Sequence, residues 1–332
     1  MHTIEEITIK EFRGIKATKE PIRLSKFNVL IGKNNSGKSS ILESLSLFPL
    51  PFKAYSIPLL GKSKFDLISG LHSSSSALIY GYSGRSEITF RVRNDKITYV
   101  LEHSSNIKTK INYAEISERE YIEKIINILE IDSKRDAIER LMTYSIFMPN
   151  DTNFIKIIGD NIKNKWNLIM KSGANVRIVK ELISKVVHDI FTEVFLGSGD
   201  ILMLRKELPN DKIFWIKVPD IGDGVEKVLI STLFIEISQP KIILWDDIEA
   251  SAHPGLIEVL IEWLAKKDVQ IVLSTHSIDV LDAISKVEPK DASILITKMD
   301  KNDFLKVRTL DLDELSDAIE SNLDIRKICD LI

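Results

Sequence analysis

The fold is decided by Gly32-Lys33-Asn34-Asn35-Ser36-Gly37-Lys38-Ser39, which completes the P-loop pattern G-x-x-x-x-G-K-S. Ahead of it, the apolar run Phe27–Ile31 is typical of a buried strand, and a helical pattern opens at Ser40. In that order, loop N–H groups surround the β- and γ-phosphates of a nucleoside triphosphate at a helix N-terminus, whose dipole favours anions. A Gly/Ser/Asn-rich turn without a ligand is the alternative interpretation, which the flanking strand and helix disfavour.

Single residues of the loop have predicted roles. Lys38 is expected to contact the β- and γ-phosphate oxygens, and the Ser39 hydroxyl is expected to bind Mg²⁺ together with a distant Asp. Asn35 and the loop amides position the phosphates. The predicted nucleotide contacts in this segment are Gly32, Lys33, Asn34, Asn35, Ser36, Gly37, Lys38, Ser39 and Ser40.

The second half of the chain supplies the distant carboxylate. Lys241–Asp247 is an apolar strand that ends in two carboxylates, the form of a Walker B segment, so Asp246 is predicted to be the second Mg²⁺ ligand. A further apolar run, Val269–Leu273, delivers His276 to the same sheet edge, where it can contact a γ-phosphate. Taken singly, such carboxylates are more often helix caps and such a histidine is more often structural. Their order and spacing after a P-loop favour a nucleotide site.

At this point the chain resembles the SMC-like and RecF-like branch of ABC-class ATPases, including the ATPase part of OLD (overcoming lysogenization defect) proteins. The resemblance covers nearly the whole chain and implies an α/β fold, an ABC-type P-loop ATPase head with a mixed sheet flanked by helices and an N-terminal antiparallel β lobe. The motifs that carry it are, in order, Phe12-Arg13-Gly14, the P-loop, Gly222-Asp223-Gly224-Val225-Glu226-Lys227, Asp246-Asp247-Ile248-Glu249 with His253-Pro254, and Ser274-Thr275-His276.

The segment from Gly222 to Lys227 resembles the ABC signature, which caps the γ-phosphate of a nucleotide held by a second subunit. The resemblance therefore implies a homodimer that sandwiches ATP, with Gly222, Asp223 and Gly224 at the nucleotide. From the residues alone, a small-residue segment that opens a helix offers free N–H donors to phosphate, and a plain loop and helix cap stays open as the alternative.

Two further segments gain meaning from the resemblance. Ala250-Ser251-Ala252-His253 resembles the D-loop, which reaches across the dimer, and a histidine at His253 is typical of the OLD-like branch. Without the resemblance, His253-Pro254 would mark a helix start, because Pro is favoured at the first helical position. Arg13, by the same resemblance, is expected to approach the nucleotide.

The chain departs from this family at two places that bear on hydrolysis. Family members generally carry Glu directly after the Walker B Asp, whereas Asp247 is one methylene shorter. We expect Asp247 to be the general base and Glu249 a substitute or supporting base, with slow turnover, because a base must come within about 2.6–3.2 Å of the attacking water or act through one more water. His276 and Lys38 complete the predicted catalytic set.

The second departure is a missing Q-loop. The only glutamines are Gln239 and Gln270, and neither lies between the P-loop and the signature segment. Other residues must therefore couple a lid to the metal.

Patterning along the chain predicts one ATPase head over residues 1–332, with a helical lid or insertion over residues 116–200. Helical spacing runs from Ser117 to Phe195 without a sustained heptad, so no long coiled-coil arm of the SMC type is expected. The segment Phe48–Ser76 is predicted to be loop. Strands are predicted at Thr3–Ile9, at Ser86–Val92 and Lys96–Glu102 with Asn94-Asp95 as their turn, and at Ser293–Thr297 and Phe304–Leu310, followed by an acidic helix at Asp313–Asn322.

Composition favours a cytoplasmic protein. The formal net charge is −3, no apolar stretch approaches the ~18 residues of a membrane span, and the amino terminus has no leader pattern. The single cysteine, Cys329, expected on a C-terminal helix, cannot form an internal disulfide. OLD proteins carry a TOPRIM nuclease after the ATPase, for which we expect no room here, so a nuclease would come from another polypeptide.

The expected ligands are ATP and Mg²⁺, and the expected output is DNA binding or repair, defence against phage or plasmids, or control of a partner nuclease. A nucleotide-dependent scaffold with negligible turnover is an alternative. A GTPase is a weaker one, resting on Thr297-Lys298-Met299-Asp300, which resembles a guanine-reading motif while the rest of the GTPase set is not evident.

A basic run within the helical segment could contact duplex phosphates, with Trp166 stacking on a base. A solvated helix face with Trp166 in the core is the favoured alternative. The run consists of Lys156, Lys163, Lys165, Lys171, Arg177, Lys180 and Lys185.

Overall fold

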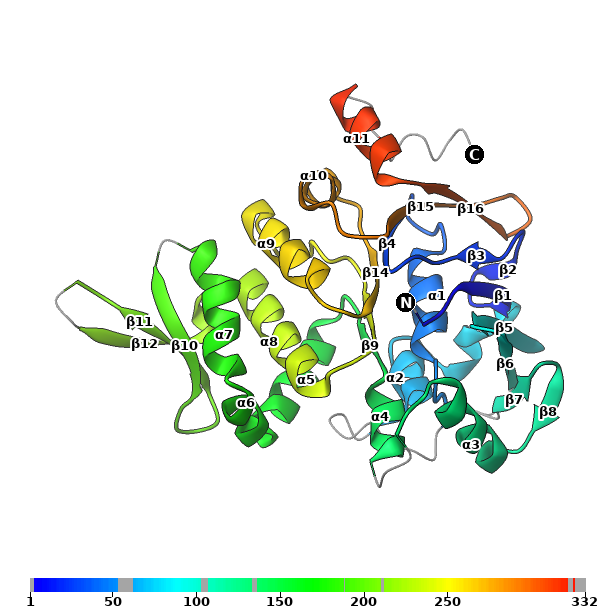
Figure 1. The fold of residues 1–332 in the computed structure, drawn as a ribbon, viewed down its shortest axis with the longest axis horizontal. Helices are drawn as coiled ribbons and strands as arrows, with labels where there is room; N and C mark the ends of the chain where they lie inside the picture. Colours follow the sequence, from blue (N-terminus) through cyan, green and yellow to red (C-terminus); the bar gives the residue numbers. More distant parts are fainter. Residues whose placement is uncertain are drawn as a thin grey trace.

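The strand before the P-loop, β4 (Phe27–Ile31), lies inside a large mixed sheet of the computed structural model (Figure 1). The structure describes residues 3–52, 62–102, 107–132, 136–187, 189–209, 212–321 and 325. Around β4 the strands are parallel, in the order β15 (Ala292–Met299), β4, β14 (Gln270–Ser274), β13 (Ile242–Trp245) and β9 (Ser145–Met148).

The central parallel strands are mostly apolar, because helices cover both faces of the sheet. Every residue of β4, β13 and β14 is buried, as is usual for parallel strands. Since these strands point the same way, the segments that follow β4, β13, β14 and β9 all emerge at one edge of the sheet. That edge brings the P-loop, the Walker B carboxylates and His276 together.

Beyond β15 the sheet continues as a lobe whose neighbouring strands are antiparallel, except that β2 and β16 are parallel. Its order is β8-β7-β6-β5-β1-β2-β16, with β3 also paired to β1. The predicted mixed sheet with an N-terminal antiparallel lobe is thereby confirmed. The bounds are β1 Glu6–Phe12, β2 Ile15–Thr18, β3 Ile22–Arg23, β5 Arg85–Val92, β6 Asp95–Glu102, β7 Ile107–Ile111, β8 Ala114–Ile116 and β16 Phe304–Leu310.

Helices flank the sheet and extend the molecule to one side (Figure 1). The helix α8 begins at Asp223 with Gly222 as its cap, as the signature segment predicted, and α9 begins at Pro254 behind His253. The bounds are α1 Lys38–Ser46, α2 Lys64–Gly70, α3 Glu118–Ile128, α4 Ala137–Thr143, α5 Thr152–Asn164, α6 Trp166–Ser172, α7 Ala174–Glu181, α8 Asp223–Ser238, α9 Pro254–Ala265, α10 Ile278–Val287 and α11 Leu312–Glu320.

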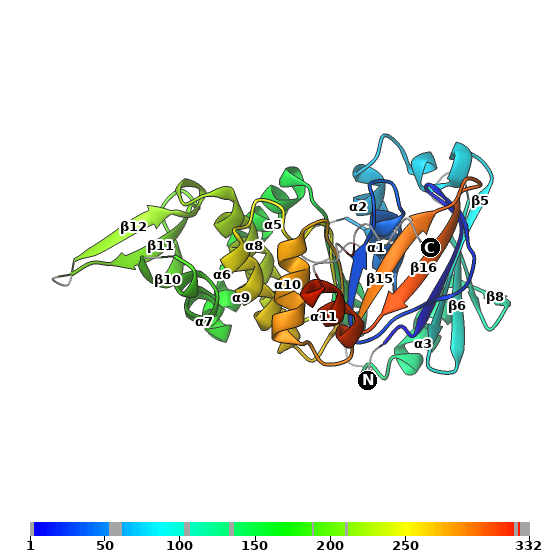
Figure 2. The ribbon, with the colours of Figure 1, turned by 90° about the horizontal axis from the view of Figure 1, so that it is seen from above.

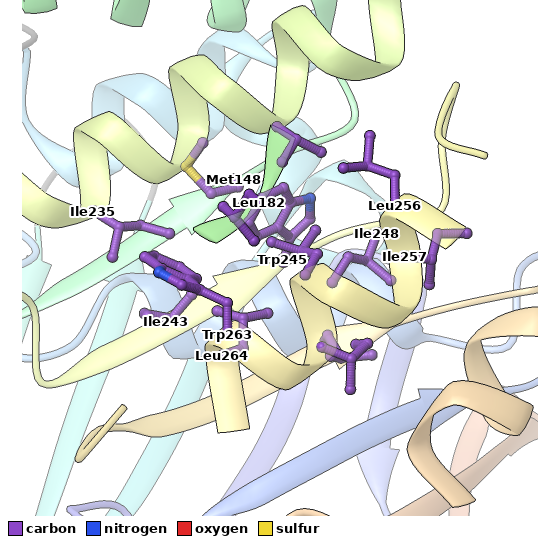
Figure 3. Packing of buried hydrophobic residues seen from close by; sticks show 14 of the residues in the cluster. Met148, Leu182, Ile235, Ile243, Trp245, Ile248, Leu256, Ile257, Trp263 and Leu264 are labelled. Atoms are coloured by element: carbon purple, nitrogen blue, oxygen red, sulfur yellow. The ribbon is translucent and has the colours of Figure 1, made fainter. Parts of the chain in front are cut away.

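The main core lies between the parallel strands and α5, α8 and α9. Trp245, the last residue of β13, is fully buried and packs among apolar side chains from these elements, with Trp263 nearby (Figure 3). Burying an aromatic residue of this size contributes much of the local packing energy. It also fixes the end of β13, directly before the two Walker B carboxylates.

The segment 116–200 differs from the helical segment expected from its spacing. It contains α3 to α7, but β9 interrupts them as a strand of the main sheet, and β10 (Ile190–Leu196) begins a separate sheet with β11 (Leu202–Glu207) and β12 (Ile213–Lys217). This small sheet projects from the end of the molecule opposite β5 to β8 (Figure 2). A four-residue strand between two helices is too short to show a period of its own, which is why the pattern concealed β9.

Four smaller predictions also need correction or fall outside the described residues. The expected loop at 48–76 contains α2, and its N-cap residue Ser63 accepts a hydrogen bond from the Asp66 N–H through its hydroxyl at 3.0 Å. Residues 53–61 lie outside the described part. The first strand lies three residues later than expected, and Val92 pairs with Asp95, so the hairpin turn is Arg93-Asn94. Cys329 lies outside the described residues. Among the helices that the structure describes, none has the length and apolarity to cross a membrane.

Candidate functional site

The P-loop adopts a backbone that only glycine permits at two positions. Gly32 has φ 156°, and a Cβ there would lie 2.5 Å from the Ser36 and Thr297 hydroxyl oxygens and 2.6 Å from the Thr297 carbonyl oxygen. Gly37 has φ 96° and caps the start of α1. Lys38 is buried, and its Nζ donates to the carbonyl oxygens of Gly32 at 3.0 Å and Lys33 at 3.2 Å. The loop is therefore closed around its lysine, with the first N–H groups of α1 at its centre.

A buried hydroxyl pair ties the P-loop to the neighbouring strand β15. Thr297 Oγ1 donates to the Ile31 carbonyl oxygen at 3.0 Å and lies 2.7 Å from Ser36 Oγ. Asp300, three residues on, pairs with Lys19 at 2.7 Å and accepts from the N–H groups of Asn302 and Phe304, which together hold its pKa at about 2. Thr297 and Asp300 thus hold the loop and the β15–β16 turn, a structural role that explains the segment without a guanine base.

The two predicted Mg²⁺ ligands meet in the folded chain. Ser39, at the start of α1, stands beside the Asp246 carboxylate, and the Ser274 hydroxyl at the end of β14 donates to Asp246 Oδ1. Burial raises the pKa of Asp246, and the charges of Asp247 and Glu43 raise it further, whereas the hydroxyls of Ser274 and Ser39 favour the charged carboxylate and lower it. Among the described residues no group of three His, Cys, Asp or Glu side chains could hold a metal, but Mg²⁺ is usually bound through one or two protein oxygens together with substrate phosphates and waters, which a hydroxyl and one carboxylate can supply. The residues present therefore fit Mg²⁺.

Asp247 lies at the open edge of the sheet. Its backbone has φ 45°, its N–H donates to Ser274 Oγ at 2.9 Å, and its side chain is 32% exposed. One carboxylate oxygen accepts from Asn150 Nδ2 at 3.2 Å, and the other lies 3.9 Å from His276 Nε2. A carboxylate so placed can reach a water molecule in front of the P-loop.

Glu249 is arranged differently. Its Oε1 accepts the backbone N–H of His276 at 2.7 Å, and its Oε2 is buried with no hydrogen-bond partner among the described residues. The side chain thus clamps the loop that carries His276. Of the two carboxylates predicted as base, the geometry favours Asp247.

Arg13 reaches α1 rather than standing free. Its Nη1 lies 2.6 Å from Oε1 of Glu43, a carboxylate only 4% exposed, and His72 Nε2 lies 3.0 Å from Oε2 of the same group. Glu43 stands one helical turn after Ser39, so this trio supports the helix that carries a predicted Mg²⁺ ligand. His72 and Glu43 carried no signal in the sequence, because their partners come from distant segments.

The signature segment packs on its own chain's D-loop. Gly222 has φ 126°, and a Cβ on Gly224 would lie 2.1 Å from the Ser251 carbonyl oxygen. His253 Nδ1 accepts the Gly255 N–H at 3.2 Å, so His253 caps α9. The predicted helix starts at both segments are confirmed, and the contact between them is a feature that only the tertiary structure reveals.

With this geometry in place, the comparison with known families is informative. Residues 27–282 match the family described as "AAA domain, putative AbiEii toxin, Type IV TA system". The chain belongs to this family. The predicted SMC-like, ABC-class P-loop fold is confirmed, and the family match includes the P-loop, the signature segment, the Walker B carboxylates and His276.

Solved structures agree on the fold of this AAA-domain chain. An Smc head domain from Pyrococcus furiosus, with an extended coiled coil and bound to the C-terminal domain of ScpA, aligns with a TM-score of 0.63 at 16% identity, covering 97% of this chain and 99% of that chain. An SMC head domain from Thermotoga maritima aligns with a TM-score of 0.53 at 14% identity, covering 94% and 100%.

Two relatives from Methanocaldococcus jannaschii match in part. The uncharacterized protein MJECL10 is 34% identical over 105 residues, and the uncharacterized protein MJECL11 is 31% identical over 75 residues. The aligned segments span 48% and 66% of those proteins and 31% and 21% of this chain.

The basic run of the helical segment is partly neutralised in this AAA-domain protein. Lys163 pairs with Asp160 at 2.9 Å, Arg177 pairs with Glu236, and Lys185 lies 3.7 Å from Glu262. Trp166 is partly buried against the main core. These contacts favour the solvated helix face over a duplex site.

Sequence reasoning also missed a polar contact beside the base. Asn150 follows β9, and its side chain joins Asp247 to Lys227 of α8. The missing signal was β9 itself, since without that strand nothing placed Asn150 at the site.

Proposed function

We propose that the protein is a Mg²⁺-dependent ATPase that cycles through an ATP-sandwiched homodimer. The observation that carries this proposal is that the P-loop Ser39 and the Asp246 carboxylate meet at one sheet edge, where the Ser274 hydroxyl joins Asp246 to the backbone of Asp247. This arrangement joins a phosphate-binding loop, two candidate Mg²⁺ ligands and a candidate base within one site.

The chain's own residues divide the work of hydrolysis. Lys38 and the N–H groups at the start of α1 hold the phosphates, and Ser39 and Asp246 hold Mg²⁺, which when bound neutralises charge on the phosphate oxygens. Asp247 orients a water molecule and takes its proton as the water oxygen bonds to the γ-phosphorus and the bond to the β–γ bridging oxygen breaks. ADP leaves with the bridging oxygen.

His276 and Glu249 support this step. His276, 3.9 Å from Asp247, contacts the γ-phosphate, and Glu249 holds its backbone in place. Asp247 is shorter than a Glu, so we expect slow turnover.

The signature segment supports the proposed dimerisation. Gly222, Asp223 and Gly224 open the 16-residue helix α8, whose N-terminal N–H groups favour phosphate. In the proposed dimer they cover the γ-phosphate of the partner's nucleotide, and the D-loop beneath Gly224 lies at the same interface. Hydrolysis reopens the dimer.

The output of the cycle is proposed from the family. A description that names a toxin–antitoxin system supports a role in defence against phage or plasmids, and the SMC-like fold supports DNA-related work or control of a separately encoded nuclease. The OLD-like assignment and a cytoplasmic location remain predictions.

A scaffold with negligible turnover is the second candidate, and the short Asp247 side chain favours it. Asp247→Glu separates the two functions. A large gain in rate with unchanged dimerisation supports the scaffold, whereas no gain supports a working Asp base.

The proposal is tested by measuring ATP turnover with and without Mg²⁺, and mass in solution with and without ATP. Lys38→Ala should abolish ATP binding, and Lys10→Ala, on an exposed face of β1, serves as the matched control. A wild-type chain that neither hydrolyses ATP nor dimerises with it would refute the proposal, and a preference for GTP over ATP would refute the nucleotide assignment.

A further inference from the structure

The side chain of Asn150 bridges two parts of the molecule that come from distant segments. Its Nδ2 donates to Asp247 Oδ2 at 3.2 Å, and its Oδ1 accepts from Lys227 Nζ at 3.3 Å. Asp247 follows β13, whereas Lys227 lies in the second turn of α8. The bridge thus joins the candidate base to the helix that opens with the signature segment.

An amide suits the chemistry of both partners. A carboxylate only accepts hydrogen bonds, and an ammonium group only donates them. Asn offers one donor end and one acceptor end, so a single orientation satisfies both neighbours. Asp at this position would face Asp247 with a second carboxylate, and Leu would satisfy neither neighbour.

The backbone around Asn150 places it where the sheet gives way to the helical region. Met148 ends β9 beside Trp245, Pro149 restricts the backbone, and Asp151 caps α5 by accepting the Phe154 N–H at 2.6 Å. Asn150 therefore lies between two fixed points, and α5 packs against α8. Lys227 and Asn150 are thus held by different elements, and a shift of α8 relative to β9 would change the contact between them.

The Lys227 ammonium group interacts with the charges of the nearby carboxylates. Burial lowers its pKa, and the carboxylates of Asp247, Glu249 and Asp246 oppose that effect. The ammonium group thus faces the carboxylates of the Walker B segment while it holds Asn150.

We propose that Asn150 is a positioning residue that couples the place of α8, through Lys227, to the orientation of the Asp247 carboxylate. This inference rests on the proposed ATPase function. While α8 stays docked, Lys227 holds the amide and the amide holds Asp247 Oδ2, which leaves Oδ1 on the His276 side. When α8 moves away, the base loses its orientation, so turnover follows the position of the signature helix.

The test is a double-mutant cycle with Asn150→Ala and Lys227→Met, which keeps the apolar stem of the lysine. Each single variant is expected to lower kcat about tenfold, a typical loss for a group that orients a catalytic carboxylate, with the Kd for ATP within about twofold. The double variant is expected to turn over no more slowly than the worse single variant, because both break one relay. Asn150→Asp, which loses the donor, should be no better than Asn150→Ala.

Matched controls come from the same helical region. Asn161→Ala removes an amide that donates, within the described part of the chain, to the Ile157 carbonyl oxygen, and Lys171→Met removes an exposed cation of α6. Both should keep wild-type kcat. Losses that multiply to about a hundredfold in the double variant, wild-type turnover in Asn150→Asp, or a Kd that changes as much as kcat would overturn the relay.

Hydrogen exchange of the nucleotide-free protein gives a readout that needs no turnover. Asn150→Ala should speed exchange in residues 222–228 and 246–250, and Asn161→Ala should not. If the wild-type protein binds ATP without hydrolysing it, the proposed function fails, and this exchange result alone decides the relay. Unchanged exchange in both segments would then refute it.

Discussion

Replacing Asp247 and Glu249, the two carboxylates that follow Asp246, should show which of them is the general base and which holds the His276 backbone. Asp247 is partly exposed beside His276, whereas Glu249 uses Oε1 to accept the His276 N–H at 2.7 Å. Asp247→Asn removes the proton acceptor but keeps the shape, so kcat should fall about 10²–10⁴-fold, which is about 2.7–5.4 kcal/mol of transition-state stabilisation. Folding stability should not fall, because the substitution also removes a like charge beside Asp246.

The two substitutions Glu249→Gln and Glu249→Ala are expected to differ in their effects on turnover and on stability. Glu249→Gln keeps an oxygen that can accept the His276 N–H, so turnover should stay within about tenfold of wild type. Glu249→Ala leaves that N–H without its acceptor and should cost about 1–3 kcal/mol of unfolding free energy, with a larger loss of turnover than Gln causes.

Single-turnover phosphate release at saturating ATP and Mg²⁺ measures the rate of hydrolysis, and urea unfolding without nucleotide measures the free energy of unfolding. Equal and severe losses of kcat in both Glu249 variants, with Asp247→Asn within tenfold of wild type, would refute the assignment. That result would make Glu249 the base.

Three further outcomes follow from the same geometry. Gly224→Ala would place a Cβ 2.1 Å from the Ser251 carbonyl oxygen and should lower the free energy of unfolding in urea by about 1–3 kcal/mol. Gly70→Ala, where a Cβ would meet nothing within 4 Å, should be neutral or stabilising, and equal effects of the two substitutions would contradict the close contact. The folded pKa of Asp246 is raised above its unfolded value, so its ionisation lowers the free energy of unfolding as pH rises above about 3.8. Asp246→Asn should therefore stabilise the nucleotide-free protein at pH 7 and not at pH 3, and it should abolish Mg²⁺-dependent ATP binding. A pH-independent difference in urea unfolding would contradict this. If duplex DNA binds the basic run, replacing Lys163 and Lys165 by Met should reduce the salt dependence of affinity by about one logarithmic slope unit per lost phosphate contact, and an unchanged slope in a salt titration would exclude the run.

Local patterns predicted much of the fold and the nucleotide-binding half of the site. The apolar runs became β4, β13 and β14, the hairpin strands lie within a residue of their predicted bounds, and the P-loop opens α1. Such signals are local, because strand burial, helix starts and phosphate-binding loops depend on residues adjacent in the chain. The order of the motifs then identified the class of ATPase.

Contacts between distant segments decided the rest. The strand β9 exists because its four residues pair with β13, about a hundred residues away, and only that pairing places Asn150 beside Asp247. The same holds for Glu249, the expected substitute or supporting base, whose contact with the His276 backbone N–H joins two segments that are distant in the sequence. The sequence by itself determined which chemical groups the chain carries and which sheet edge they share. Only the tertiary structure decided which of them touch, because a hydrogen bond needs atoms within about 3 Å, and chain order does not specify that distance.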